Sequence, residues 1–241
     1  MTQANQGGDG PKRPDRRHAT IDGADLLPGV EAEVVQKVLV AGTLKNVAAG
    51  TVIMKEGSPD PSFVILLKGA VKVSHNLDDG RQIVNELRRA PSFFGHVETL
   101  AQIPTLASVD ALEFCQVLEV PRPALAEALK TSDKMMTLLV AEDGRRLARA
   151  AYNQRALAND ATEKRLARLL LSYLELFGLP IDGGIKIRVP LTQDELGDAL
   201  AVNRRSIIRA LQEWKDRNLV FKSGDSYAVS DPKALEEIAK K

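Results

Sequence analysis

The spacing of apolar positions divides the chain into two different halves. Between residues 49 and 120, short runs rich in β-branched and aromatic residues alternate with breaks that contain glycine. Such runs, joined by turn residues at regular spacing, are typical of antiparallel strands that close into a small roll or barrel. The predicted strands are 51–54, 62–67, 70–75, 82–87, 107–109 and 114–120.

From residue 132 onward the apolar spacing is that of α-helices. A long helix is predicted over about residues 132–157, and its apolar stripe has near-heptad spacing that Asp143 and Gln154 interrupt. Such a stripe packs either on the chain's own β domain or against a second helix. Because no earlier long helix is predicted, a seam between two subunits is favoured. The expected interface residues are Met136, Leu139, Val140, Leu147, Ala150 and Leu157. Residues 159–160 are expected to form a hinge and helix cap before a second helix over 161–177.

Residues 191–229 predict two short helices that are joined by a tight turn. Thr192 and Glu195 have the spacing of a capping box, which begins a helix. Gly197 has no Cβ, so a second helix can approach closely, and Asn203 is suited to cap that second helix. The apolar residues of the second helix follow the helical period at Ile207, Ala210, Leu211 and Trp214.

The opposite face of this second helix carries Arg205, Arg209 and Gln212. A recognition helix enters the major groove of DNA by its N-terminal end, where an arginine can donate two hydrogen bonds to O6 and N7 of guanine. Arg204 lies to the side, where a phosphate contact is the alternative to a base contact. With a strand before it and a hairpin after it, the region predicts a winged helix-turn-helix. The expected DNA-binding residues are Thr192, Asn203, Arg204, Arg205, Ser206, Arg209 and Gln212.

The region from about residue 49 to 229 resembles the cyclic AMP receptor protein/FNR (CRP/FNR) family of bacterial transcription regulators. The resemblance rests on segments 191–197 and 203–209, on the roll that contains Phe93-Phe94-Gly95, and on the long helix between them. It implies an α+β fold with an N-terminal cyclic-nucleotide-binding-like antiparallel β-roll, a long dimerisation helix and a C-terminal winged helix-turn-helix. It also implies a homodimer on near-palindromic double-stranded DNA, with RNA polymerase as a further candidate partner.

This organisation divides the chain into four expected parts. They are a disordered arm over 1–19, an effector domain over 20–130, a dimerisation helix and hinge over 131–159, and a DNA-binding domain over 160–241. Many family members have a glutamate after the first arginine of the recognition helix, where it accepts a hydrogen bond from cytosine. Arg205 occupies that position, so the preferred base is expected to change toward guanine.

The effector domain also departs from the family pattern. In cyclic-AMP-responsive members a glutamate holds the ribose and an arginine holds the phosphate, whereas the matching positions here are His96 and Thr105, and Leu106 replaces a serine. A buried phosphate without its cation costs several kcal/mol, so ordinary cyclic AMP is not expected. Three alternatives remain for the control of this domain: an atypical ligand such as another nucleotide, a partner protein, or no effector. The candidate effector pocket comprises Gly95, His96, Thr105, Leu106, Arg88 and Arg89.

Two of these residues have ordinary structural interpretations as well. A lone histidine beside such a pocket is more often a hydrogen-bonded structural residue than a haem ligand or sensor. Arg88 and Arg89 could contact a phosphate from a neighbouring turn, but adjacent arginines usually lie on a solvated surface.

Composition narrows the classes of protein to which this chain can belong. The 241 residues are 44% hydrophobic and carry 33 basic and 32 acidic side chains, although residues 20–120 alone carry 8 basic and 13 acidic ones. The single cysteine, Cys115, is expected to be a small buried residue, and neither a cofactor nor a metal or iron–sulfur site is expected. No apolar run approaches the ~20 residues of a membrane span, so a cytoplasmic protein is expected.

No nucleotide-hydrolase, metalloprotease or serine-hydrolase motif is present, so no catalytic residues are nominated and an enzyme is not expected. The competing hypothesis is a cyclic-nucleotide-type sensor or scaffold that acts through protein partners. Salt dependence distinguishes the two, because phosphate contacts make DNA affinity fall steeply with ionic strength.

Overall fold

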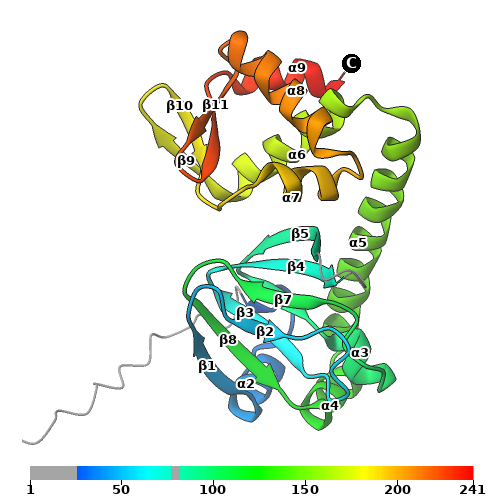
Figure 1. Cartoon of the computed structure of the whole chain (residues 1–241). Coiled ribbons are helices and arrows are strands. Elements are labelled where there is room, and N and C mark those ends of the chain that lie inside the picture. Colours follow the sequence, from blue (N-terminus) through cyan, green and yellow to red (C-terminus); the bar gives the residue numbers. More distant parts are fainter. Residues whose placement is uncertain (1–25, 77–81, 241) are drawn as a thin grey trace, which may run out of the picture.

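The computed structural model describes residues 26–76 and 82–240, so the expected disordered arm over 1–19 lies outside the described residues. In Figure 1 a β-roll forms the lower half of the molecule and a second domain forms the upper half. Helix α5 (Asp133–Asn159) runs along one side and links the two. The long predicted helix therefore runs from the β-roll to the C-terminal domain.

The β-roll consists of two four-stranded sheets with the strand orders β1-β8-β3-β6 and β2-β7-β4-β5. Their strands are β1 (Thr43–Val47), β2 (Val52–Met54), β3 (Phe63–Lys68), β4 (Ala70–Asn76), β5 (Gln82–Arg89), β6 (Ser92–Phe94), β7 (Ser108–Ala111) and β8 (Cys115–Val120). All the strand pairs in these sheets are antiparallel. The predicted strands occur within two residues of their expected ends, but β1 and β6 were missed. Strand β1 is almost wholly exposed and therefore lacks an alternating pattern.

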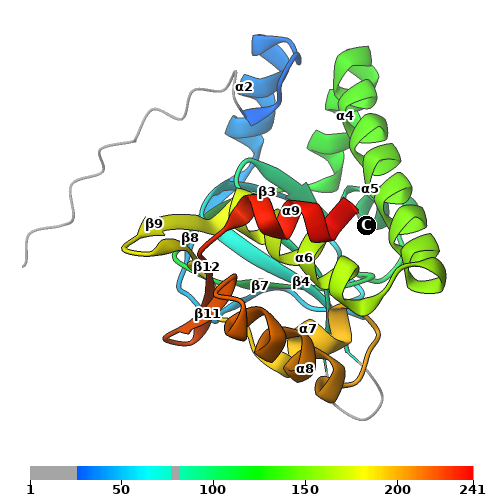
Figure 2. The ribbon, with the colours of Figure 1, turned by 90° about the horizontal axis from the view of Figure 1, so that it is seen from above.

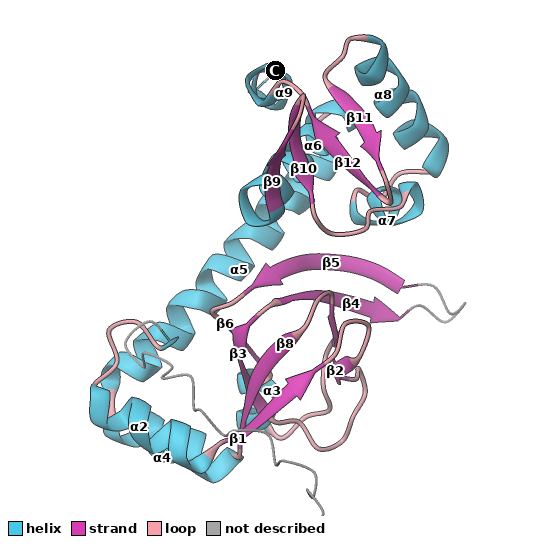
Figure 3. Ribbon diagram, turned by 90° about the vertical axis from the view of Figure 1, so that its left-hand side faces the viewer, coloured by secondary structure: helices cyan, strands magenta, loops and turns pink. Residues whose placement is uncertain are grey.

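Three short helices that the apolar spacing did not predict cover the β-roll. They are α2 (Ala32–Ala41), α3 (His96–Ala101) and α4 (Arg122–Thr131). Helices α2 and α4 lie side by side at one end of the roll, as Figure 3 shows, and bury a shared core against β3 and β8. Pro121 is the N-cap of α4 and Pro123 lies in its first turn, where a missing N–H costs nothing.

The C-terminal domain begins with α6 and ends with α9. Its elements are α6 (Thr162–Phe177), β9 (Gly178–Ile181), β10 (Gly184–Ile187), α7 (Gln193–Ala199), α8 (Arg204–Asp216), β11 (Val220–Ser223), β12 (Ser226–Val229) and α9 (Pro232–Lys240). The strands form one sheet in the order β11-β12-β10-β9. Figure 2 shows α7 and α8 side by side, and Trp214 and Phe177 lie in the core that the surrounding helices enclose.

The two domains also touch through apolar side chains. Val84 and Leu87 of β5 share one core with Leu196 of α7, and strands β4 and β5 lie directly below α7 in Figure 1. Arg89 adds a polar contact, because its Nη1 donates to the carbonyl oxygen of Leu176 at 3.2 Å. The helix-turn-helix is thus docked on the β-roll through its first helix.

Candidate DNA-binding surface and effector region

Side chains at the helix ends hold the two helices of the helix-turn-helix in place. The hydroxyl of Thr192 accepts a hydrogen bond from the Glu195 amide at 3.1 Å, and the Glu195 carboxylate accepts one from the Thr192 amide at 2.9 Å. This is the predicted capping box. Asn203 caps α8 by accepting from the amide of Ser206 at 2.9 Å. Thr192, Asn203 and Ser206 therefore all serve the local fold.

The turn between these helices depends on Gly197. A Cβ at this position would lie 2.9 Å from the carbonyl oxygen of Val202, which is closer than two such atoms approach. The Val202 amide in turn donates to the Gly197 carbonyl at 2.9 Å, and Ala201 adopts a positive φ of 49°. The absence of a side chain at Gly197 therefore sets the close approach of α8 to α7, as the sequence indicated.

Helix α8 has one buried face and one exposed face. Its buried residues are Ile207, Ala210, Leu211 and Trp214. Arg205, Arg209 and Gln212 are exposed on the other face. Gln212 donates to Asp216 at 2.8 Å, whereas Arg205 and Arg209 form no hydrogen bond or ion pair with another described residue. These two guanidinium groups remain open to an external acceptor.

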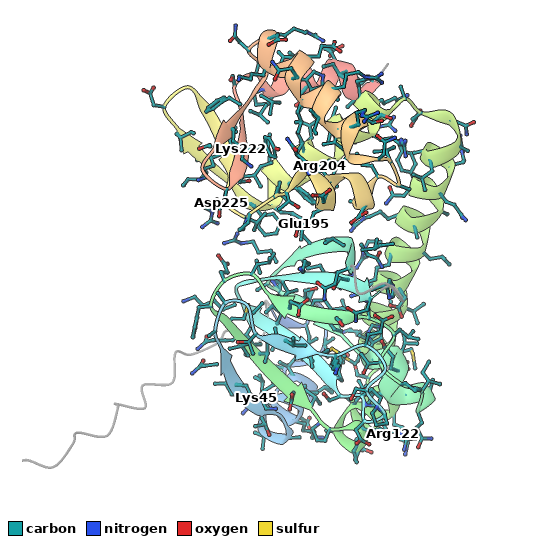
Figure 4. All side chains as sticks on the ribbon, viewed as in Figure 1. Lys45, Arg122, Glu195, Arg204, Lys222 and Asp225 are labelled. Carbon is teal, nitrogen blue, oxygen red and sulfur yellow. The ribbon has the colours of Figure 1, made fainter. Side chains whose placement is uncertain are left out.

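Arg204 differs from these two arginines, because it turns toward α7. Its Nε lies 3.3 Å from Oε1 of Gln193 and 3.8 Å from Oδ2 of Asp194. Figure 4 places Arg204 near Glu195 of α7, with Lys222 on the hairpin of β11 and β12. Lys222 was not among the expected DNA-binding residues, and its ammonium group lies 4.5 Å from the centroid of the Tyr227 ring on the neighbouring strand.

His96 lies buried at the start of α3, with 3% of its side chain exposed. A carboxylate can only accept, so Nε2 carries a proton and donates to both oxygens of Asp143, at 3.0 and 2.9 Å. The rings of Phe63 and Phe93 meet the imidazole edge to face, with centroids 6.2 and 5.8 Å away. His96 is the hydrogen-bonded structural residue that its isolation in the sequence suggested.

The expectation that Arg88 lies on a solvated surface is wrong, because only 7% of its side chain is exposed. Its Nε donates to Glu86 at 2.8 Å, its Nη1 donates to the Phe93 carbonyl at 3.3 Å, and its guanidinium lies 5.0 Å above the Phe94 ring. Neighbouring residues of a strand point to opposite faces, so Arg88 turns inward while Arg89 reaches the second domain.

Acidic and basic side chains of α5 surround this buried arginine. Burial raises the pKa of the Glu142 carboxyl, but a hydrogen bond from Arg145 and the charges of Arg146 and Arg88 outweigh burial and hold that pKa below its usual range. Burial, followed by the like charge of Arg88, lowers the pKa of the Arg146 guanidinium. The Arg88 guanidinium therefore already pairs with Glu86 and Glu142 within the chain.

The remaining candidates of the effector pocket differ in burial and in their contacts. Thr105 is buried, and its backbone is hydrogen-bonded to two neighbouring residues of another segment. Its amide donates to the Ser58 carbonyl at 2.9 Å, and its carbonyl accepts from the Gly57 amide at 2.8 Å. Leu106 is 54% exposed, so the expectation that it lines a buried phosphate site is wrong. Gly95 has a φ of 73°, and a Cβ there would lie 2.2 Å from the Ser62 carbonyl.

Helix α5 exposes most of the apolar stripe that the sequence indicated. The exposed fractions are 46% for Met136, 61% for Val140, 73% for Leu147 and 46% for Leu157. Ala150 is exposed as well. Leu139 is an exception, because it is only 3% exposed and packs in the core with α2 and α4. Its assignment to a subunit interface is therefore wrong, since this turn of α5 points into the chain's own core.

Both halves of the chain match known families. Residues 44–132 match the family model of the cyclic nucleotide-binding domain, and residues 164–238 match that of the Crp-like helix-turn-helix domain. The chain belongs to the CRP/FNR family. This CRP/FNR protein is a DNA-binding transcription regulator, and its curated relatives are regulators rather than enzymes.

Two such relatives cover most of this CRP/FNR regulator. The CRP-like cAMP-activated global transcriptional regulator of Mycobacterium tuberculosis is 23% identical over 217 residues, which cover 90% of this chain and 97% of the relative. The global nitrogen regulator of Synechocystis is 27% identical over 183 residues, which cover 75% of this chain and 81% of the relative.

Solved structures confirm the predicted α+β class, with β-roll, long helix and winged helix-turn-helix. A CRP/FNR transcriptional regulator from Thermus thermophilus superposes with a TM-score of 0.71 at 21% identity, covering 83% of this chain and 99% of that one. The c-di-GMP responsive global regulator CLP of Xanthomonas campestris gives 0.72 at 16% identity, covering 83% and 100%. At these identities the likeness establishes the fold.

A small cavity lies between the two domains of this CRP/FNR regulator. The cavity measures about 80 Å³ and lies between β4, β5 and the start of α7, with Lys72, Leu87 and Tyr173 in its wall. Burial raises the pKa of the Tyr173 hydroxyl. Cys115 is buried, as expected. Within the described ranges, no group of three His, Cys, Asp or Glu could hold a metal ion, and no helix is long and apolar enough to cross a membrane.

Proposed function

We propose that this chain is a homodimeric, sequence-specific regulator in which α8 reads the major groove of a near-palindromic operator. The observation that carries the proposal is the exposed face of α8. Arg205 and Arg209 project from its N-terminal half without a partner among the described residues, opposite a fully buried apolar face. A helix presented in this way is suited to enter the groove by its N-terminal end.

Arg205 and Arg209 are the proposed base-reading residues. An arginine fork matches the two acceptors of guanine, so the base opposite Arg205 is expected to be guanine. Arg204 is already held at Nε by Gln193, which leaves its terminal nitrogens for a base or a phosphate. Gln212 is a weaker candidate, because its amide is engaged with Asp216.

The exposed stripe on α5 supports the proposed homodimer. Val140 and Leu147 are more than half exposed, and large apolar side chains in heptad-like spacing are stabilised when a second helix covers them. Two copies of α5 running in parallel would bring both winged helices to the same side of the dimer. A palindromic site needs this arrangement, because each subunit then contacts one half-site.

We further propose that control does not use ordinary cyclic AMP, although a relative is described as cAMP-activated. A buried cyclic phosphate needs a cation, and Thr105 supplies none. Arg88 is held by Glu86 and the Phe93 carbonyl, so recruiting it would break these contacts. Glu98 accepts from the Leu106 amide at 3.2 Å, which places a carboxylate beside the segment where the phosphate would be expected.

Selection of preferred sites from random DNA tests the proposed recognition. Arg205→Ala is expected to weaken the selected site by about 1–3 kcal/mol, or roughly 5- to 150-fold, and to relax preference at one base pair per half-site. Arg205→Lys should keep nonspecific affinity, because the charge remains, but lose discrimination, because the fork is gone.

Arg217→Ala is the matched control, because Arg217 is half exposed at the other end of α8 and pairs with Glu213. It should select the wild-type sequence. If all variants select one sequence with equal stringency, Arg205 contacts only phosphate. DNA affinity that does not fall as salt rises would instead favour a scaffold that acts through protein partners.

A further inference from the structure

The hairpin of β11 and β12 is fastened to the start of α7. The amide of Leu191, which lies just before α7, donates to the carbonyl oxygen of Asp225 in the hairpin turn at 3.1 Å. Tyr227 follows two residues later on β12, and its side chain is buried. Its cross-strand partner is Lys222, whose ammonium group lies over the tyrosine ring. The position of this tyrosine is therefore set by the hairpin and by the segment that leads into α7.

Gln193, the first residue of α7, bonds both to this tyrosine and to the recognition helix. Its Oε1 accepts from Nε of Arg204 at 3.3 Å, and its side chain is also hydrogen-bonded to the Tyr227 hydroxyl. A carboxamide has an acceptor end and a donor end, so one orientation of Gln193 satisfies both partners. Its oxygen accepts from the arginine while its nitrogen donates to the tyrosine. Gln193 thus bridges the hairpin and α8.

This bridge restricts the guanidinium group of Arg204. The guanidinium is planar, so a hydrogen bond at Nε limits the directions in which Nη1 and Nη2 can point. The other partner is Asp194, whose Oδ2 lies 3.8 Å from Nε, but both side chains of this ion pair are exposed and it contributes little. Arg205 and Arg209, in contrast, have no partner among the described residues that would restrict them.

A restricted arginine is better suited to a base than to a phosphate. Reading guanine needs two hydrogen bonds from one fork to O6 and N7, so the direction of the fork decides the strength of the contact. A phosphate accepts from many directions and gains less from a fixed fork. A phosphate beside Nε would also lie near the carboxylate of Asp194, whereas the edge of a base carries no net charge.

We propose that Gln193 is a positioning residue for sequence recognition, which uses its bridge to Tyr227 to align Arg204 with a base. This inference rests on the proposed entry of α8 into the major groove. In this role Gln193 acts through Arg204 and makes no contact with DNA itself. The hairpin contributes to sequence preference as well, because Tyr227 keeps the Gln193 amide in the orientation that accepts from the arginine.

The experiment selects preferred sites from random DNA with full-length protein. The base pair read by Arg204 is the one at which Arg204→Ala abolishes the preference. Gln193→Ala should reduce the preference at that base pair about five- to tenfold, because one surface hydrogen bond to a charged group is lost. The preference at the base pair read by Arg205 should not change. Adding Gln193→Ala to Arg204→Ala should have no further effect, because Gln193 acts only through that arginine.

Two conservative variants separate the parts of the bridge. Tyr227→Phe removes the hydroxyl but keeps the ring beneath Lys222, so it should weaken the same preference about two- to threefold. Gln193→Glu should keep the preference, because its carboxylate can accept from Arg204 and from the tyrosine hydroxyl. Its added negative charge should lower the affinity for all sequences alike.

Gln116→Ala is the matched control, because the Gln116 amide also joins two elements, β8 and β1, by donating to Asn46, but does so in the β-roll. It should select the wild-type site. Circular dichroism melts check that each variant folds, and Tyr227→Phe keeps the test decisive if Gln193→Ala does not fold.

Three results would overturn the inference. They are an Arg204→Ala variant that keeps every base preference, a Gln193→Ala variant that selects the wild-type sequence with equal stringency, and an effect of Gln193→Ala that adds fully to that of Arg204→Ala. Each leaves the proposed function intact as long as Arg205→Ala relaxes its own base pair. If neither arginine variant changes the selected sequence, base reading by α8 fails together with this inference.

Discussion

Replacing Leu147 by aspartate tests the proposed dimer interface on α5 at its most exposed large apolar side chain. Leu147 is 73% exposed, and full burial of a leucine contributes about 1.5–3 kcal/mol. Covering that exposed portion would therefore contribute about 1–2 kcal/mol per subunit, or about 2–4 kcal/mol for the two copies in a dimer. Loss of this term alone raises the dissociation constant about 30- to 1,000-fold, and the two facing carboxylates add to the effect.

The assay compares sedimentation and operator binding of the variant with those of Val40→Asp. Val40 on α2 is 75% exposed, so the same charge is added to an equally exposed apolar position outside the stripe. Leu147→Asp should sediment as a monomer and bind the operator weakly, because a monomer loses its partner's half-site, while Val40→Asp should behave as the wild type. If Leu147→Asp forms the wild-type dimer at the same concentrations, the α5 stripe is not the subunit interface.

Two further predictions concern the β-roll and Asp160, the residue that caps the end of α5. Calorimetry should detect no binding of cyclic AMP at micromolar concentrations, because Thr105 offers no cation; micromolar affinity would mean that a buried arginine such as Arg88 has left its partners. Hydrogen bonds from Arg168 and then Lys164 lower the pKa of the Asp160 carboxyl, so its contribution to stability is present above the ordinary aspartate pKa of about 4 and is lost as the pH falls through the lower folded value. Asp160→Asn should therefore flatten the acid side of the stability profile in thermal melts between about pH 2 and 5. An acid side that is unchanged from the wild type would contradict this role.

Local patterns were enough to predict the helix-turn-helix. The capping box at Thr192, the N-cap at Asn203 and the small residue Gly197 each act within a few residues of themselves, so their effect can be read from the chain alone. The same is true of the amphipathic face of α8. For the predicted strands of the β-roll, alternation and turn residues were sufficient, whereas β1 is almost wholly exposed and leaves no alternating pattern.

Contacts between distant segments decided the rest. Leu139 and Leu147 look alike in the apolar stripe, but only the packing of α2 and α4 determines that Leu139 is buried and Leu147 is exposed. Arg88 and Arg89 are adjacent in sequence, yet the two faces of β5 give one a buried set of partners and the other a contact with the second domain.

The hydrogen bond between His96 and Asp143 joins residues 47 positions apart. Nothing in the sequence near either residue encodes it, because it depends on how α3 and α5 pack on the same β-roll. The sequence by itself determined the elements whose signals are local, namely the helix caps, the turns and the periodic faces. The tertiary structure decided which charged and apolar side chains are neutralised or covered, because burial and charge pairing are properties of segments that meet only after folding.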